Sequence, residues 1–198
     1  MTPKDIFNTY GALHVKDVVS QELANFLTHV MLRSPAYLMR HEDDQVKGSI
    51  ALMDHEVMLE TLLEKTWHKI ENVIEEELIP TYAYGRVYTN GNILEKHKDR
   101  PSCEISVTVQ LARSHHYAWP IYMGDQRFDL AEGDGVIYKG CDIEHWRNFC
   151  DAPSNYYSGQ VFLHYVKKNG SYADYAGDNR WNENIPFIRN RNLILENK

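Results

Sequence analysis

Residues 88–99 read YTNGNILEKHKD and place His97 and Asp99 two positions apart in a segment that the pattern predicts to be extended. In a strand, the side chains of residues i and i+2 point to the same face, so both can bind one ion. His145 lies in another expected strand, residues 142–149. Two histidines and one carboxylate form the facial triad that binds non-heme Fe(II) and leaves positions on the metal open. We therefore predict that His97, Asp99 and His145 bind iron.

The same spacing occurs a second time, at His41-Glu42-Asp43. That copy lies in a charged and polar run with no strand-like segment beside it, which predicts a loop between two helices. The copy at 97–99 follows the β-rich segment 82–88 and precedes residues 105–111, in which apolar and polar residues alternate. This context favours the copy at 97–99 over the alternative that its members are surface polar residues beside a turn.

Two segments before residue 80 have apolar residues every three or four positions, which is typical of amphipathic helices. The first covers residues 20–33, with Ser20 as its expected N-cap. The second covers residues 54–78, with Asp54 as N-cap and Pro80 as the residue that closes it. We therefore expect two helices in the first part of the chain.

The spacing of apolar residues changes to every second position from Tyr82 onward, and turn signals separate the runs. A short strand is also expected at residues 12–15. Helices followed by strands predict an α+β domain in which helices brace a sheet. We expect one domain over residues 1–198, with three parts: a mainly helical support (1–79), a strand-rich core (80–168) and a C-terminal extension (169–198). The large side chains of this extension predict that it packs on the core: Tyr172, Tyr175, Trp181, Phe187 and Ile188.

The composition of the 198-residue chain is that of a globular domain, with 43% hydrophobic and 25% charged residues. The net charge of −7 and the absence of a basic block argue against a nucleic-acid-binding surface. No apolar run is long enough for a membrane span or a secretion signal. The three cysteines are never in C-x-x-C spacing, which favours reduced thiols and a cytoplasmic location. The oligomeric state stays open.

The opening stretch resembles the prolyl 4-hydroxylase-type signature, in which Tyr-x-x-Gly-x-x-Tyr-x-x-His-x-Asp leads into the metal site. Tyr88, Gly91, His97 and Asp99 match it, and Leu94 replaces the second tyrosine. Further on, residues 128–138 resemble the strand, glycine turn and strand that precede the distal histidine of the family. The resemblance covers roughly residues 80–168.

The resemblance implies a double-stranded β-helix, or jelly-roll, core that uses Fe(II), with 2-oxoglutarate and O2 as co-substrates. It implies oxidative decarboxylation of 2-oxoglutarate with O2, followed by hydroxylation of an unactivated C–H bond. The substrate stays open among a peptidyl proline, another protein side chain, a free amino acid and a small metabolite. Because the cofactor carries the hard chemistry, no protein general base is expected. Two alternatives stay open. One is a cupin-type metalloenzyme that turns over without 2-oxoglutarate, and the other is a non-catalytic jelly-roll binding module.

One position departs from the family, in which a Lys or Arg about ten residues after the distal histidine pairs with the far carboxylate of 2-oxoglutarate. Here that position is Asn155. Arg147 is our first candidate for the role, because it lies at i+2 from His145 and so points the same way, about 6.5–7 Å further along the strand. Its guanidinium can pair bidentately with a carboxylate. Arg86 is the rival, and the resemblance implies that the Tyr88 hydroxyl donates to the same carboxylate.

Several other residues carry weaker predictions. Ser106, Thr108 and Gln160 are polar residues on expected strands and could face the interior, where Thr108 and Gln160 would reach the co-substrate, although a register shift of one residue reverses the face. His164 is expected to be a hydrogen-bonded core or rim histidine rather than a ligand. Trp146 alternates with His145, so we expect it to pack against the helices.

Overall fold

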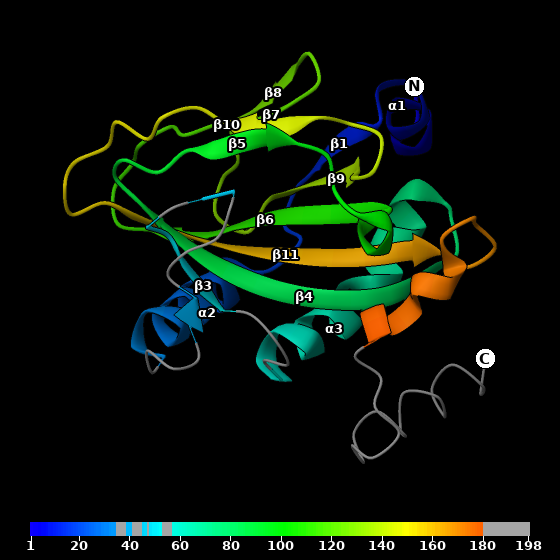
Figure 1. Ribbon diagram of the computed structural model, residues 1–198, viewed down its shortest axis with the longest axis horizontal. Helices are drawn as coiled ribbons and strands as arrows, with labels where there is room; N and C mark the ends of the chain where they lie inside the picture. Colours follow the sequence, from blue (N-terminus) through cyan, green and yellow to red (C-terminus); the bar gives the residue numbers. More distant parts are fainter. Residues whose placement is uncertain (35–38, 41–44, 47, 53–56, 180–198) are drawn as a thin grey trace.

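The computed structural model describes residues 1–34, 39–40, 45–46, 48–52 and 57–179. Two antiparallel sheets lie face to face, and helices cover the outer side of the larger one (Figure 1). The helices of the described chain are α1 (Pro3–Tyr10), α2 (Gln21–Arg33) and α3 (Val57–Ile74). The mixture of helices and antiparallel sheets confirms the predicted α+β class.

The larger sheet has the strand order β1-β9-β6-β11-β4-β3-β2, and the smaller has the order β5-β10-β7-β8. The strands of the larger sheet are β1 (Ala12–Val15), β2 (Met39–Arg40), β3 (Ile50–Leu52), β4 (Leu78–Thr89), β6 (Ile105–Arg113), β9 (Gly135–Lys139) and β11 (Tyr157–Lys167). Those of the smaller sheet are β5 (Leu94–His97), β7 (Ile121–Met123), β8 (Gln126–Phe128) and β10 (His145–Arg147). Sequence neighbours β4 to β11 are thus divided between two sheets, which places residues far apart in the chain opposite one another.

Strand β6 shows how the alternating pattern builds the layers. Its apolar residues Val107, Val109 and Leu111 belong to the same buried cluster as residues of α2 and α3 such as Leu27 and Leu59. The polar residues between them are buried as well, on the opposite face, toward the smaller sheet. The predicted division of this strand into two faces is therefore confirmed, and the polar face lines the space between the sheets.

The helical predictions are confirmed in part. Helix α2 begins after Ser20, whose hydroxyl accepts a hydrogen bond from the backbone N–H of Leu23 at 3.2 Å. Helix α3 ends at Ile74, where Glu75 has a φ of 54°, so the expected end at Pro80 is wrong. Pro80 lies inside β4, beyond the part of that strand that pairs with β3, where a missing N–H is tolerated. The expected N-cap Asp54 lies outside the described residues.

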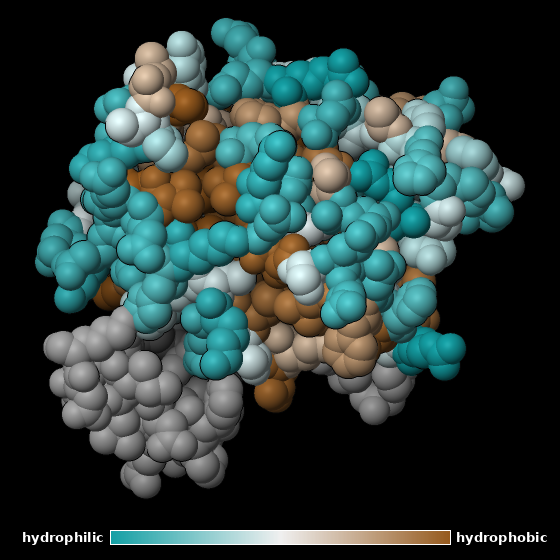
Figure 2. All heavy atoms as spheres, turned by 180° about the vertical axis from the view of Figure 1, so that it is seen from behind, coloured by the Kyte–Doolittle hydropathy of each residue, from teal (hydrophilic) through white to brown (hydrophobic). Residues whose placement is uncertain are grey.

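Large apolar side chains are not confined to the interior. On the helices, Phe26 is 59% exposed and Val57 is 63% exposed. Figure 2, which shows the molecule from behind, has apolar patches between polar side chains. Within the described residues, no helix combines the length and the apolar content that crossing a membrane requires.

The described part of the C-terminal extension packs against β4 as a 3₁₀ segment, Ala173–Asn179. Arg100 and Asp178 form a two-pronged ion pair there, with Nη–Oδ distances of 2.5 and 2.6 Å. Tyr175 is 42% exposed, so the expected burial of the aromatic residues is incomplete for this one. The other large residues from position 181 onward lie outside the described residues. The ion pair attaches the extension next to Asp99.

We expect truncation after Lys168 to lower the melting temperature by at least about 2–4 °C. The truncation removes the partner of Arg100, and a well-aligned but partly exposed pair contributes about 1 kcal/mol. Thermal unfolding monitored by circular dichroism measures the effect, and the full-length variant Asp178→Asn isolates the share of the ion pair. An unchanged melting temperature in the truncated chain would show that the extension contributes nothing to the fold.

Candidate metal centre

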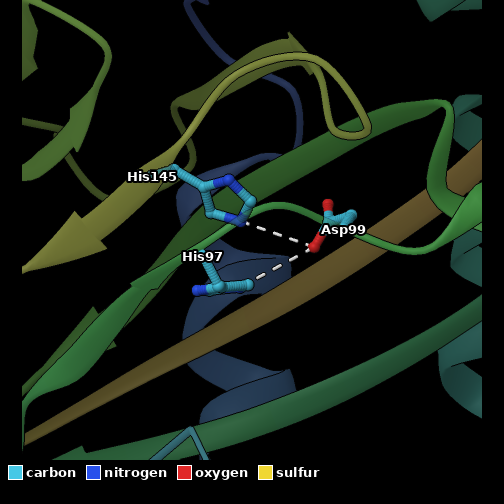
Figure 3. A group of neighbouring side chains, drawn as sticks. All are labelled: His97, Asp99 and His145. Atoms are coloured by element: carbon cyan, nitrogen blue, oxygen red, sulfur yellow. Dashed lines mark ion pairs between the residues drawn. The ribbon is translucent and has the colours of Figure 1, made fainter.

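The three predicted ligands meet where the neighbouring strands β5 and β10 of the smaller sheet end and begin (Figure 3). His97 is the last residue of β5, Asp99 follows in the next loop, and His145 is the first residue of β10. The strands pair antiparallel with His145 directly opposite His97, and the two rings lie 4.2 Å apart between centroids. The pairing of β5 with β10, together with the His97-x-Asp99 spacing, thus places both imidazoles beside the carboxylate of Asp99.

The hydrogen bonds of the two histidines leave the nitrogen that faces Asp99 available for a metal. His97 Nδ1 lies 2.7 Å from the carbonyl oxygen of Glu95, and His145 Nδ1 lies 3.0 Å from that of Ile143. Because a carbonyl only accepts, each Nδ1 carries the proton and each Nε2 keeps its lone pair. The Nε2 atoms lie 3.7 Å (His97) and 3.4 Å (His145) from the same Asp99 oxygen, Oδ1. Three donor atoms therefore converge, which fits a divalent transition metal.

The charge states also fit metal binding. Burial, and then the neighbouring His145, lowers the pKa of His97, so its imidazole is neutral at pH 7. Burial alone would raise the pKa of Asp99, but its contact with His145 and the nearby histidines lower the pKa to about 2. Asp99 is therefore ionised. At neutral pH, His97 and Asp99 already have the protonation states that a metal requires.

The position of Asp99 is fixed by contacts that the sequence analysis did not identify. Its backbone N–H donates to the carbonyl oxygen of Gly140 at 2.9 Å, and the Ser106 hydroxyl donates to its Oδ2 at 3.0 Å. A Cβ atom on Gly140 would lie 2.5 Å from Oδ2 and nearer still to the carbonyl of Cys103. Only glycine fits at position 140. In the sequence, the glycine directly after residues 135–139 was the signal that could have indicated this close approach.

Arg147 crosses the space between the sheets, with 2% of its surface exposed. One terminal nitrogen donates to the carbonyl oxygen of Trp119, and the other donates to Gln160 Oε1 at 2.9 Å. Both acceptors are neutral, and within the described chain Nε has no hydrogen-bond partner. Burial lowers the pKa of this guanidinium to about 10, which leaves it charged at pH 7. A buried cation with free donor capacity is suited to binding an anion.

Arg86 lies on the inner face of β4, directly opposite Gln160 of β11. Its Nη1 donates to the hydroxyl of Ser49 at 3.1 Å. The guanidinium carbons of Arg86 and Arg147 lie 5.7 and 6.0 Å from the centre of the Tyr88 ring. The structure therefore brings four predicted co-substrate residues together: Tyr88, Arg86, Arg147 and Gln160.

The remaining predicted position, Thr108, is buried on the polar face of β6. Gln110 on the same face was missed: its Oε1 accepts from Gln160 at 3.2 Å, and its Nε2 donates to Ser158 at 2.9 Å. A cavity of about 120 Å³ adjoins Arg147 and Gln110. The Arg147 guanidinium is thus held by the amide of Gln160, which is held in turn by that of Gln110, and it lies next to this cavity.

The expectation for Trp146 is wrong, whereas the expected burial and hydrogen bonding of His164 are confirmed. Trp146 stacks on Tyr122 with ring centroids 5.3 Å apart, and the Lys96 ammonium lies 4.8 Å from the centre of its ring. It lies on the outer face of the smaller sheet, which the helices do not cover (Figure 1). His164 is buried and lies 2.9 Å from the hydroxyl of Ser106.

No model of a known protein family matches the chain, and no curated protein sequence matches it. Solved structures do. A prolyl-4-hydroxylase from Pseudomonas putida has a TM-score of 0.61 at 14% identity, covering 84% of this chain and 97% of that one. HygX from Streptomyces hygroscopicus, solved with nickel and 2-oxoglutarate bound, has a TM-score of 0.63 at 11% identity, covering 83% and 86%.

A third similar structure is an oxidoreductase of the 2OG-Fe(II) oxygenase family from Burkholderia pseudomallei. It has a TM-score of 0.63 at 15% identity, and the match covers 86% of this chain and 92% of that one. These similarities span most of each chain and confirm the resemblance at the level of architecture. The chain has the fold of the 2-oxoglutarate- and Fe(II)-dependent oxygenases.

Proposed function

We propose that the protein is an Fe(II)- and 2-oxoglutarate-dependent dioxygenase that hydroxylates an unactivated C–H bond. The observation that carries the proposal is the convergence of His97 Nε2, His145 Nε2 and Asp99 Oδ1, with both histidine tautomers set for metal binding. HygX, which has the same fold, binds nickel and 2-oxoglutarate. In this proposal the three residues hold Fe(II), which supplies the redox chemistry that O2 activation requires.

We also propose that strands β4 to β11 form a double-stranded β-helix. Four of them, in the order β9-β6-β11-β4, lie in the larger sheet, and the other four form the smaller sheet. Residues 80–168 are then the catalytic core of a single domain. Residues 1–79 brace its outer face, and residues 169–198 extend from it. The three cysteines form no disulfide, and on that basis we propose a cytoplasmic location.

The co-substrate would be held by the residues gathered around Tyr88. Arg147 pairs with the far carboxylate of 2-oxoglutarate, and the Tyr88 hydroxyl donates to the same group. Gln160 holds one terminal nitrogen of Arg147 and so sets the direction of the guanidinium. Because these side chains are buried, water is excluded from the pair and the electrostatic attraction is stronger than at the surface.

Arg147 is preferred over Arg86 because it lies on the same sheet as His97 and His145. Arg86 already contacts Ser49 and the rings of Tyr84 and Tyr88, and it lies on β4, on the opposite sheet from the metal ligands. Arg147 shares the short strand β10 with His145, so a ligand held at one end of that strand reaches the other. Arg86 stays the second candidate for the role.

The proposed substrate is a peptidyl proline or another amino-acid side chain. The similar structure from Pseudomonas putida is a prolyl-4-hydroxylase, which supports a substrate of this class. The chain's own part in the reaction is to hold the metal and the 2-oxo acid, so no side chain is assigned as a general base.

The test is whether the purified protein, with Fe(II), ascorbate and O2, converts 2-oxoglutarate to succinate and CO2. Mass spectrometry measures the succinate formed, and an oxygen electrode measures the O2 consumed. We expect a slow uncoupled turnover that requires all three components and rises when the substrate is added. Turnover of a substrate without 2-oxoglutarate would favour the cupin-type enzyme. Failure to bind Fe(II) would favour the binding module.

A further inference from the structure

The two carboxylate oxygens of Asp99 have different surroundings. Oδ1 faces the Nε2 atoms of both histidine ligands, at 3.7 Å (His97) and 3.4 Å (His145). Oδ2 lies 3.0 Å from the hydroxyl of Ser106. It also lies so close to Gly140 that a side chain as small as a methyl group on that residue would clash with it. One oxygen is therefore directed at the metal position, and the other is held by the protein.

Ser106 is in turn bound by His164. The two residues are direct cross-strand partners on β6 and β11, and the serine Oγ lies 2.9 Å from His164 Nδ1. His164 is 3% exposed, and its ring lies against that of Tyr82 with centroids 4.5 Å apart. The contacts thus form a chain from His164 through Ser106 to Asp99.

The direction of the protons in this chain follows from the donors available. A serine hydroxyl has one proton, and the ionised carboxylate of Asp99 is a stronger acceptor for it than the Cys103 carbonyl oxygen, which lies 3.1 Å away. Ser106 then accepts from His164, which requires a proton on Nδ1. Burial lowers the pKa of His164 to about 4, so the ring is neutral and Nε2 carries only a lone pair. This agrees with the lack of a partner for the buried Nε2 among the described residues, since an orphaned lone pair costs less than an orphaned N–H.

We propose that Ser106 and His164 are positioning residues for the metal centre: His164 Nδ1–H holds Ser106, and Ser106 holds Asp99 Oδ2, so that Asp99 binds the metal through Oδ1 alone. This proposal rests on the proposed function for the presence of the metal. A carboxylate held at one oxygen occupies a single coordination position, which leaves the others to 2-oxoglutarate and O2.

A competing interpretation gives His164 a different role. Donor atoms of Asp99, Cys103 and His164 also lie within 4.8 Å of one another and could hold a second metal ion. Engagement of His164 Nδ1 by Ser106 leaves Nε2 with its lone pair, as in His97 and His145, so it is the Cys103 thiol that argues against this interpretation. Burial raises the pKa of the Cys103 thiol to about 12, and the thiol lies 3.2 Å from the hydroxyl of Tyr82. The number of metal ions bound per chain distinguishes the two interpretations.

The test compares His164→Asn with His164→Gln. The amide nitrogen of Asn occupies the place of Nδ1 and can donate to Ser106, whereas that of Gln occupies the place of Nε2 and cannot. The metal alone, Co(II), is titrated into the apo-protein under argon while its visible absorption reports affinity and coordination number. We expect one Co(II) per chain, binding by His164→Asn within a few-fold of wild type, and binding by His164→Gln and Ser106→Ala weakened roughly 10–100-fold.

Thermal unfolding of each apo-variant separates positioning from packing. The proposal would be overturned in favour of a packing role if the Asn and Gln variants lost Co(II) affinity equally and in proportion to their decrease in melting temperature. Two Co(II) ions per wild-type chain, with one lost in both His164 variants, would overturn it in favour of a second metal site. If wild type binds one Co(II) with the expected variant order but never consumes 2-oxoglutarate, the positioning role stands and the proposed function fails. If wild type binds no Co(II), both fail.

Discussion

Replacing His97 or His145 by alanine is expected to abolish Fe(II) binding and 2-oxoglutarate turnover while the chain still folds. Each variant loses one of the three ligand atoms. Loss of a residue that only supports a ligand weakens metal binding by up to roughly 100-fold, so loss of a ligand itself should weaken it more. Neither side chain belongs to the apolar cluster between the larger sheet and the helices. Circular dichroism should therefore remain that of wild type.

Fe(II) affinity measured by anaerobic titration and succinate formation are the two readouts. Asp99→Ala should behave like the histidine variants, because it removes the carboxylate ligand. His115→Ala is a matched control, since His115 lies in a loop and forms a hydrogen bond with the hydroxyl of Ser114. Wild-type oxidation of 2-oxoglutarate by both the His97 and the His145 variant would refute the metal assignment.

Arg147→Ala is expected to raise the 2-oxoglutarate concentration required for half-maximal turnover by tens- to hundreds-fold. A charge-assisted pair contributes about 1.5–3 kcal/mol, and the buried carboxylate of the co-substrate would be left without its partner. Fe(II) binding should change little, because Arg147 contacts Trp119 and Gln160 rather than the ligands. Steady-state kinetics with 2-oxoglutarate as the varied reactant measures the effect.

Arg86→Ala is the matched comparison, since both arginines are buried and contact Tyr88. We expect a smaller increase from Arg86→Ala, and partial recovery in Arg147→Lys, which keeps the charge but loses the two-pronged geometry. If Arg86→Ala has the much larger effect, the carboxylate is held from β4 instead. The melting temperature of each variant shows whether the buried charge also supports the fold.

Local pattern was sufficient to predict the elements with a long, regular period. The alternation along residues 105–111 and the helix after Ser20 are both observed. The eight-residue helix α1 was missed because it is too short to show a period, although Thr2 and Asp5 form a capping box at its start. The end of α3 was misplaced because Pro80 was interpreted as a helix terminator, whereas the chain already leaves the helix at Glu75.

The site divides in the same way. The i, i+2 spacing predicted that His97 and Asp99 lie together, although only His97 is on a strand and Asp99 lies in the loop that follows. The supporting roles of Ser106 and Gln110 could not be predicted from the sequence. They depend on the cross-strand register, and a shift of one residue turns each side chain to the opposite face. Trp146 was assigned to the wrong neighbours because alternation gives the face of a strand but not the sheet to which the strand belongs.

The most direct test of the central claim is anaerobic titration of the apo-protein with Fe(II) and then 2-oxoglutarate. The ligand set of His97, His145 and Asp99 leaves positions for a bidentate 2-oxo acid. A weak visible metal-to-ligand charge-transfer band should therefore appear only when both are present, saturate at one equivalent of each, and disappear on admission of O2. Tight binding of Fe(II) with no such band at saturating 2-oxoglutarate would contradict the account.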